Sequence, residues 1–287
     1  MSFESLQSIV TLCHEQHITF AQAVRTLEVQ TSGISEEEQY SRMHSLWSCM
    51  QDASRNYDAS LRSASGLSGG DGEKFRLYAQ EKDSLCGSFV SAVVTEALKM
   101  AESNACMKRI VAAPTAGSCG VLPAILMPLY QSGQTGDADI VESLFVAAGI
   151  GQVIANRASI SGAEGGCQAE IGSASAMAAG TLVFLRNGAV EQVCHAVGYA
   201  LQNLLGLVCD PVGGLVEIPC IKRNVIGAVN ALTAADMALA GIVPVIPPDE
   251  VIDAMRSVGR KLDASLKETG RGGLASCPTA LKLCHAL

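Results

Sequence analysis

The sequence of 287 residues predicts a compact, mainly α-helical protein in which glycine-rich loops separate the helices. Composition is the first observation behind this prediction: 48% of the residues are hydrophobic but only 4% are aromatic, so Ala, Val, Leu and Ile supply most of the apolar surface. Small side chains let helices pack closely. The pattern also lacks the alternation of strands and helices that marks a parallel sheet, and it contains no repeat of solenoid length.

The chain divides into an N-terminal helical region, residues 1–62, and a larger helical domain, residues 63–287. Within the first region, Ser35 is a predicted N-cap, because the acidic run Glu36–Glu38 follows it and suits the first turn of a helix. The two parts meet at the polar segment Ser63–Gly72. Its composition favours a linker, although successive backbone N–H groups in such a loop also suit an anion.

A helical pattern over residues 73–105 precedes the loop Ala113–Gly120, and Pro123 then marks the first turn of another helix. A helix start that follows hydroxyl groups and glycines is an anion site suited to a carboxylate. The loop lacks the Gly-Lys-Ser/Thr ending of a nucleotide-binding P-loop.

Further helices are expected in the second half of the chain. They cover residues 139–154, 173–185, 191–208, a segment that begins near Ile221, and 249–266. The longest apolar stretch, residues 225–246, contains Asn230, Asp236 and Pro244. A lipid-spanning helix rarely carries these residues, so we expect a buried helix and no membrane association.

Charge and cysteine content restrict the partners and the compartment. A net charge of −8 argues against a nucleic-acid-binding surface, which is usually basic. The 11 cysteines cannot all pair, and the start of the chain, Met1–Glu4, lacks the features of a secretion signal. Free cysteines without such a signal predict a cytoplasmic protein.

Three cysteines, Cys167, Cys209 and Cys220, lie at glycine or proline breaks that allow their thiols to turn toward one centre. Three thiolates are one ligand short of a closed four-thiolate iron–sulfur site, and a catalytic metal site keeps one position open. The hypothesis is therefore an iron–sulfur cluster that does chemistry. Structural zinc is the alternative, although the spacings of 42 and 11 residues differ from the usual Cys-x₂₋₄-Cys pairs.

Four segments of the chain carry a resemblance to a known family. They are Ile110–Gly120, Ser161–Gly172, Cys209–Asn224 and Gly273–Thr279. Their sequences closely resemble the α chain of bacterial iron–sulfur L-serine dehydratase, and the resemblance extends from about residue 65 to residue 279.

The resemblance implies a fold, a cofactor and a reaction. Residues 63–287 would form a helical catalytic domain, in which Cys167, Cys209 and Cys220 hold a [4Fe-4S] cluster with one iron free. The implied reaction converts L-serine to pyruvate and ammonia without pyridoxal phosphate, a step of amino-acid catabolism that supplies gluconeogenesis. Many members split the enzyme into α and β chains, and this chain is similar to the α chain alone.

The implied reaction needs a Lewis acid for the serine hydroxyl, a base for the Cα proton and groups that neutralise the carboxylate. Cations in the first turn of a helix oppose its dipole, which suggests either an anionic ligand or a solvated surface for Lys222. The candidate substrate-binding residues are Ser65, Gly66, Ser68, Thr115, Gly117, Ser118, Lys222 and Asn224.

The general base has no candidate in this chain. None of the five histidines lies in the four segments, and the resemblance implies a Ser-Ser-His motif in the β region, which this chain lacks. The chain alone is therefore expected to be inactive or weak, and to need a β chain and a larger oligomer. Relatives that are one chain end in a cysteine that can cap the open iron; for Cys284, a plain surface thiol is favoured over that role.

Other functions remain open from sequence. A pyridoxal-phosphate dehydratase would use a lysine such as Lys222, but the flanking cysteines would then have no role. A [4Fe-4S] cysteine desulfidase and a non-catalytic cluster-binding subunit are the alternatives within cluster proteins. The preference for serine over cysteine or threonine is likewise open. An exposed cluster iron would make the protein oxygen-sensitive.

Overall fold

The computed structural model describes residues 3–284 and confirms the mainly α-helical fold. The helices are α1 Leu6–Gln16, α2 Phe20–Ser32, α3 Glu36–Arg55, α4 Asp71–Glu81, α5 Gly87–Ala105, α6 Val121–Gln131, α7 Asp137–Arg157, α8 Gly162–Gly165, α9 Ser173–Leu185, α10 Val190–Gln202, α11 Cys220–Leu239, α12 Pro248–Lys261 and α13 Pro278–Cys284. No strand occurs within the described residues, which contain one isolated parallel bridge between Cys209 and Lys267.

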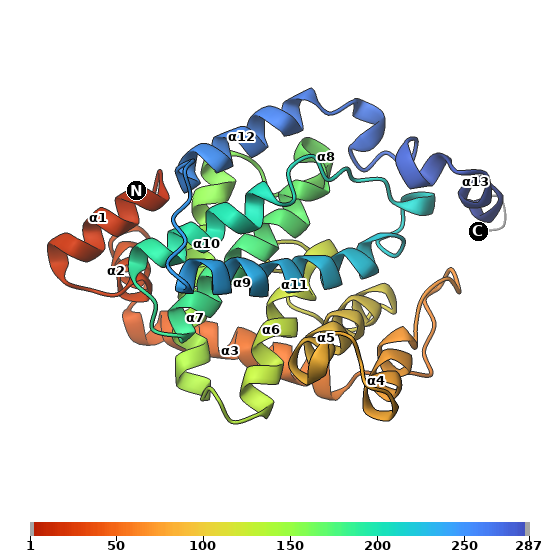
Figure 1. The fold of residues 1–287 in the computed structure, drawn as a ribbon, viewed down its shortest axis with the longest axis horizontal. Coiled ribbons are helices and arrows are strands. Elements are labelled where there is room, and N and C mark those ends of the chain that lie inside the picture. The colour runs from red at the N-terminus through yellow and green to blue at the C-terminus, as the bar shows by residue number, and fades with distance from the viewer. Residues whose placement is uncertain (1–2, 285–287) are drawn as a thin grey trace.

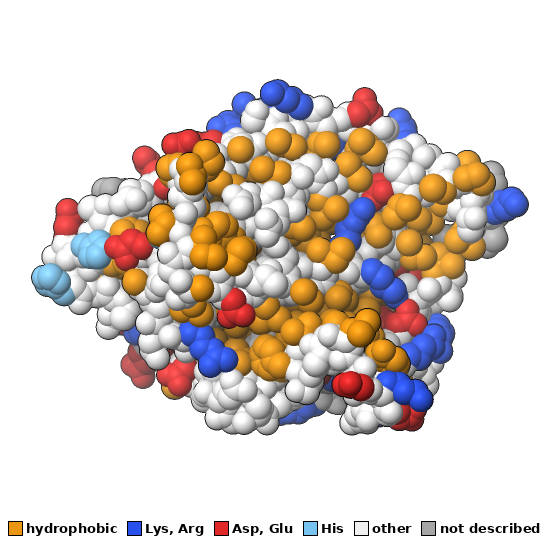
Figure 2. Space-filling model, viewed as in Figure 1, with side chains coloured by type: hydrophobic (Ala, Val, Ile, Leu, Met, Phe, Trp, Pro, Cys, Tyr) orange, Lys and Arg blue, Asp and Glu red, His pale blue; other side chains and the backbone are white. Residues whose placement is uncertain are grey.

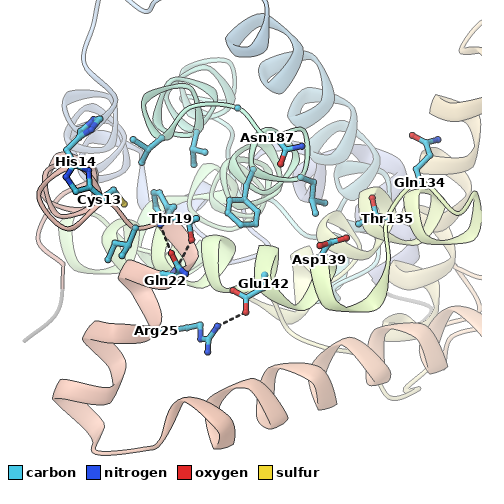
Figure 3. Close-up of a pocket in the computed structure, with 18 residues that line it drawn as sticks. Cys13, His14, Thr19, Gln22, Arg25, Gln134, Thr135, Asp139, Glu142 and Asn187 are labelled. Carbon is cyan, nitrogen blue, oxygen red and sulfur yellow. Dashed lines mark hydrogen bonds and ion pairs between the residues drawn. The ribbon is translucent and has the colours of Figure 1, made fainter.

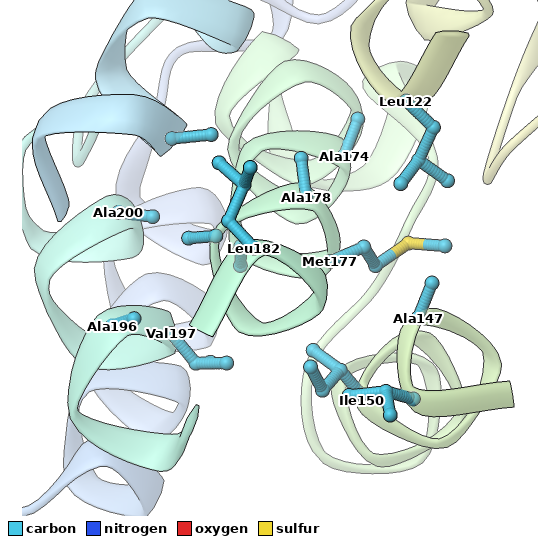
Figure 4. Packing of buried hydrophobic residues seen from close by; sticks show 14 of the residues in the cluster. Leu122, Ala147, Ile150, Ala174, Met177, Ala178, Leu182, Ala196, Val197 and Ala200 are labelled. Atoms are coloured by element: carbon cyan, nitrogen blue, oxygen red, sulfur yellow. The ribbon is translucent and has the colours of Figure 1, made fainter. Parts of the chain in front are cut away.

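Helix α9 lies at the centre of the core. Every residue from Ser173 to Val183 is buried, and the helix packs against α6, α7, α10 and α11. Figure 4 shows the small side chains of α9, such as Ala174 and Ala178, beside Met177 and Leu182, which extend toward the neighbouring helices. The alanine-rich composition therefore allows the close helix packing that the sequence predicts.

The N-terminal helices share this core. Trp47 of α3 is fully buried in the same cluster as the α9 side chains, and its indole N–H donates to Asp137 at 2.6 Å. Helix α3 begins as expected, because the Ser35 hydroxyl accepts the N–H of Glu38. Figure 1 shows α1 and α2 at one end of the molecule and the C-terminal helix α13 at the other.

The prediction of one buried helix over residues 225–246 is wrong at its C-terminal part. Helix α11 ends at Leu239, and Gly241 follows with a positive φ of 81°. Val243 and Val245 are then 67% and 94% exposed. A glycine in the left-handed region stops the helix before the apolar residues, so they form an exposed loop before α12.

One helix of the described chain, α7, is long and apolar enough to span a membrane by length and composition. Its most apolar window is 61% buried against other helices, as in the core helix of a folded domain.

Apolar side chains also reach the surface beside α11, where Figure 2 shows them interrupted by few charges.

Candidate active site

Cys167 lies in a tight turn between α8 and α9. Gly166 precedes it with φ of 79°, and a Cβ there would lie 2.9 Å from the Leu207 carbonyl oxygen, so the turn requires glycine. After Cys167 the chain forms a π-helix, Gln168–Gly172, a rare element that is frequent at functional sites. Cys167 itself is 2% exposed.

Gln168 fixes the position of this turn. Its side chain is buried, and its Nε2 donates to the carbonyls of Gly165 and Met255 at 2.9 and 3.0 Å. Its Oε1 accepts the N–H of Gly206 at 2.9 Å. Because all its polar atoms are used, Gln168 holds Cys167 against α12 and against the segment that leads to Cys209.

The backbone of Cys209 is hydrogen-bonded through both its N–H and its carbonyl group. Its N–H donates to the Leu266 carbonyl at 2.9 Å, and its carbonyl accepts the N–H of Glu268 at 2.8 Å. The next residue, Asp210, is buried; it accepts the N–H of Leu274 at 2.8 Å and lies 2.8 Å from the Arg223 guanidinium. The C-terminal segment therefore fixes the Cys209 backbone.

Cys220 begins α11, next to a peptide bond between Ile218 and Pro219 that is cis. Four residues later, the Asn224 Nδ2 donates to the carbonyl oxygens of Cys220 and Gly117, at 3.0 and 2.8 Å. Its Oδ1 accepts the N–H of Gly120 at 2.8 Å. Asn224 thus ties the predicted carboxylate loop to the helix that carries Cys220.

The three thiols lie in one region. Burial raises the pKa of Cys167 to about 12 and that of Cys220 to about 11, and it also raises the pKa of Cys209. The positive charge of Arg223 partly offsets this effect, because it lowers the pKa of Cys167 and of Cys220. Hydrogen bonds join the three segments: the Gln168 N–H donates to the Leu207 carbonyl at 2.9 Å, and the Arg223 guanidinium donates to the Val208 carbonyl at 2.8 Å. The segments that carry Cys167 and Cys220 therefore both contact the segment that carries Cys209.

The three cysteines are free thiols, the kind of side chain that binds zinc or an iron–sulfur cluster. Thiolates on one zinc ion lie about 2.3 Å from the metal and must almost touch one another. No group of three Cys, His, Asp or Glu side chains in residues 3–284 is that close together. Coordination of a metal or a cluster would remove the protons that burial retains on these thiols.

Glu170 is a site residue that the sequence reasoning missed. It lies on the π-helix three residues after Cys167, and its Oε2 accepts the Cys209 thiol at 3.9 Å. Gly162 has no room for a side chain, because a Cβ there would lie 2.6 Å from Oε2, whereas a Cβ on Gly117 would make an ordinary contact at 3.4 Å from Oε1. Burial raises the pKa of Glu170, and a hydrogen bond from Thr115 lowers it.

The predicted carboxylate-binding residues fall into three groups. Thr115 and Ser118 lie together, with hydroxyl oxygens 3.1 Å apart, beside Gly117 and Glu170. Lys222 instead pairs with Asp71 at the start of α4 and is 61% exposed. The third group is the Ser63–Gly70 loop.

The Ser63–Gly70 loop already holds a carboxylate. The hydroxyls of Ser63 and Ser65 donate to Glu217 at 2.8 and 2.9 Å. Gly66 and Ser68 shape the loop through backbone hydrogen bonds to Ser63. The segment is therefore bonded to the loop between Cys209 and Cys220, and two of its serine hydroxyls are already engaged by a carboxylate of this chain.

A cavity of about 940 Å³ lies elsewhere, between α1, α2, α7 and the α9–α10 connection. Figure 3 shows His14, Arg25 and Glu142 around it, with the last two joined by an ion pair. None of the predicted site residues lines this cavity. His14 and His17 line this cavity, and the histidine side chains visible in Figure 2 lie at the end of the molecule opposite α13.

Comparisons with known proteins agree with the resemblance of the four segments. The family model for the serine dehydratase alpha chain matches residues 15–275. A probable L-serine dehydratase alpha chain of Bacillus subtilis is 43% identical over 281 residues, which cover 98% of this chain and 94% of that protein. The L-serine dehydratase alpha chain of Peptoniphilus asaccharolyticus is 41% identical over 278 residues, covering 96% and 95%. The L-serine dehydratase of Helicobacter pylori is longer: at 36% identity, the match covers 95% of this chain but 61% of that protein.

Proposed function

The chain belongs to the serine dehydratase alpha-chain family, and from this premise we propose that it deaminates L-serine to pyruvate and ammonia as the α chain of a two-chain enzyme. The observation that carries the proposal is that the segments of Cys167 and Cys220 are both hydrogen-bonded to the residues that immediately precede Cys209. Their backbones are fixed by buried side chains, although the thiols themselves make no disulfide.

The three cysteines would hold a [4Fe-4S] cluster with one iron free. When bound, such a cluster supplies a Lewis acid that polarises the serine hydroxyl. The chain contributes the surroundings: Gln168, Asp210 and Asn224 hold the three thiol-bearing segments in place. This scheme requires no Schiff-base lysine, which a pyridoxal-phosphate dehydratase would need.

The groups that would receive the substrate carboxylate are Thr115, Ser118 and the backbone at the start of α6. The two hydroxyls lie together at a helix start, where neutral donors and the helix dipole favour an anion. Asn224 supports this loop through Gly117 and Gly120, so its role is to position the loop. Lys222 is engaged with Asp71 and is left outside this group.

The general base would come from the β chain. In the described residues, His14 and His17 line the distant cavity and His195 lies on α10. Burial lowers the pKa of His195, as expected for a packed histidine. The proposed function therefore includes a β chain that covers the cysteine site and forms a larger oligomer with this chain.

The test is reconstitution under anaerobic conditions. The α chain and a β chain of the same family would be produced together, and pyruvate formation from L-serine would be followed with lactate dehydrogenase. Turnover that requires both chains and iron supports the proposal. Turnover by the α chain alone would contradict the role of the β chain, and the absence of turnover in iron-loaded complex would contradict serine deamination.

The cysteines also bear on compartment and stability in air. All eleven are free, and Cys86, Cys277 and Cys284 are exposed. Exposed free thiols suit the reducing cytoplasm, which we propose as the location. Because the open iron of the cluster would be accessible to oxidants, aeration of the complex should abolish turnover together with the iron content.

A further inference from the structure

Glu217 is a buried carboxylate in the loop between Cys209 and Cys220. It is 6% exposed, and its contacts are hydroxyl groups. Ser63 donates to its Oε2 at 2.8 Å, and Ser65 lies 2.9 Å from both of its oxygens. Neutral hydroxyls solvate a carboxylate, but they leave its negative charge without a counter-charge.

Two other buried acidic residues are matched by a cation. Glu96 also accepts a serine hydroxyl, from Ser54 at 2.7 Å, but Lys99 lies 2.6 Å from its other oxygen. Asp210 lies 2.8 Å from the guanidinium of Arg223. In both cases a permanent positive charge offsets the cost of burying the carboxylate.

The charge of the fourth buried acidic residue, Glu102, is compensated by the N-terminus of a helix. It accepts the N–H groups of Asp71 and Gly72 at 2.8 and 3.1 Å. These amides begin α4, where the helix dipole supplies a partial positive charge. The charge of Glu102 is therefore compensated inside the protein.

Glu217 has neither kind of partner among residues 3–284. No Lys, Arg or His forms an ion pair with it. Arg62 is on the same loop as Ser63, but its guanidinium donates to the carbonyls of Ala59 and Leu61. A buried anion that lacks a cation is costly, unless a ligand supplies the charge.

The position of Glu217 connects it to the candidate active site. The preceding residue, Val216, lies 3.6 Å from the Cβ position of Gly117, and Glu170 Oε1 lies 3.4 Å from the same position. Glu217 is therefore next in sequence to a residue that contacts the Thr115–Ser118 loop, and its carboxylate joins the loop between Cys209 and Cys220 to the Ser63–Ser65 segment. An amino acid bound there carries a carboxylate, a hydroxyl and an ammonium group, and only the ammonium needs an anion.

We infer that Glu217 binds the α-ammonium group of the amino-acid substrate, and that Ser63 and Ser65 hold its carboxylate in position. The inference rests on the proposed function and adds to it the residue that selects amino acids over hydroxy acids. Ser63 is suited to this positioning role, because its backbone N–H donates to the Ser68 carbonyl while its hydroxyl accepts the Ser68 N–H.

The test uses the anaerobic two-chain enzyme with Glu217→Gln, which keeps the shape and the hydroxyl acceptor but removes the charge. The ligands are L-serine and 3-hydroxypropionate, which is serine without its ammonium group. We expect kcat/KM for L-serine to fall by about tenfold or more, mainly through KM, because a hydrogen bond to a charged group is lost. The inhibition constant of 3-hydroxypropionate should change by less than about twofold, within the range of an unaffected site.

Glu96→Gln is the matched control, because it neutralises a buried carboxylate that also accepts a serine hydroxyl but is paired with Lys99 inside the protein. It should leave both constants unchanged. Glu217→Asp, which retains the charge, replaces Glu217→Gln if far-UV circular dichroism shows that the latter does not fold; it should raise KM for L-serine and leave the inhibition constant unchanged.

An equal change in both constants would overturn the inference, as would no change in either. Tighter binding of both ligands would also overturn it, because Glu217 would then be an internal competitor for the substrate carboxylate. If the wild-type complex does not consume L-serine, the proposed function fails. The ammonium site is then tested separately, by comparing the melting-temperature shifts that L-serine and 3-hydroxypropionate give in wild type and Glu217→Gln.

Discussion

The amide of Asn224 donates to the carbonyl of Gly117 at 2.8 Å, across 107 positions of the chain. The same side chain also bonds Gly120 and Cys220, and it is 1% exposed. One residue thus fixes a loop of the candidate active site relative to Cys220. The side chain has no donor left for a substrate.

Asn224→Asp tests this positioning role. The substitution keeps the shape but replaces two N–H donors with an oxygen that faces two carbonyls, so we expect a loss of about 1–3 kcal/mol of unfolding free energy. Urea unfolding of the isolated chain measures it. Asn104→Asp is the control, because Asn104 donates to Ala116 in the same loop from an exposed position; an equal loss in both variants would contradict the prediction.

The buried pair of Asp210 and Arg223 predicts a second stability effect. The two side chains are 3% and 12% exposed, so Asp210→Asn leaves a buried guanidinium without its counter-charge. We expect a cost of about 3–5 kcal/mol, as for other broken buried pairs, and a lower melting temperature.

Asp253→Asn provides the comparison for the Asp210 variant. It removes the partner of Arg157 in a pair whose aspartate is 52% exposed, where the cost should be about 0–1 kcal/mol. If the two variants melt at the same temperature, burial of the Asp210 pair has no energetic consequence and the prediction is wrong.

Gly162→Ala should disturb the centre of the site. A Cβ at this position would lie 2.6 Å from Glu170 Oε2 and 3.0 Å from the Cys209 sulfur, so one of these groups must move. We expect a cost of about 1–3 kcal/mol, typical of overpacking, and a loss of iron from the anaerobically prepared chain. Gly136→Ala, where the nearest atom is 3.9 Å from the Cβ, should retain its iron; retention by both variants would argue against a crowded site.

The iron content of cysteine variants tests the ligand set. Anaerobically purified wild-type chain should hold about four iron and four sulfide per chain, the composition of a cubane cluster. Cys167→Ser, Cys209→Ser and Cys220→Ser should each hold much less and lack the visible absorbance of the cluster. Cys86→Ser alters an exposed thiol and should keep both. Zinc in place of iron in the wild type would exclude the cluster.

Local sequence signals predicted much of the helical framework. The alanine-rich segment 173–185 is helical over the predicted residues, because its composition favours a helix and its ends are marked locally. The cap at Ser35 is equally local. The prediction for residues 225–246 failed because it used hydrophobicity alone, whereas Gly241 and Pro244 end the helix.

The site was less accessible from sequence, because its contacts join distant positions. Ser63 and Glu217 are 154 residues apart and Asn224 bonds a loop more than 100 residues away; no periodicity reports such pairs. Glu170 was detectable in principle, because it follows Cys167 by three residues and such spacing places side chains on one helical face. No comparable sequence signal points to Glu217, because its proposed role depends on which charges lie near it in the folded protein.

The contacts that hold the three cysteines also have a kinetic consequence. Helix α9 forms from neighbours in sequence, whereas Cys209 gains its backbone partners only when the segment around Leu266 and Glu268 has docked. Closing such long loops has an entropic cost, and non-local pairings slow folding. The region around the three cysteines should therefore form late on the folding pathway, after the helical core, and the proposed cluster would be assembled in a chain that is already largely folded.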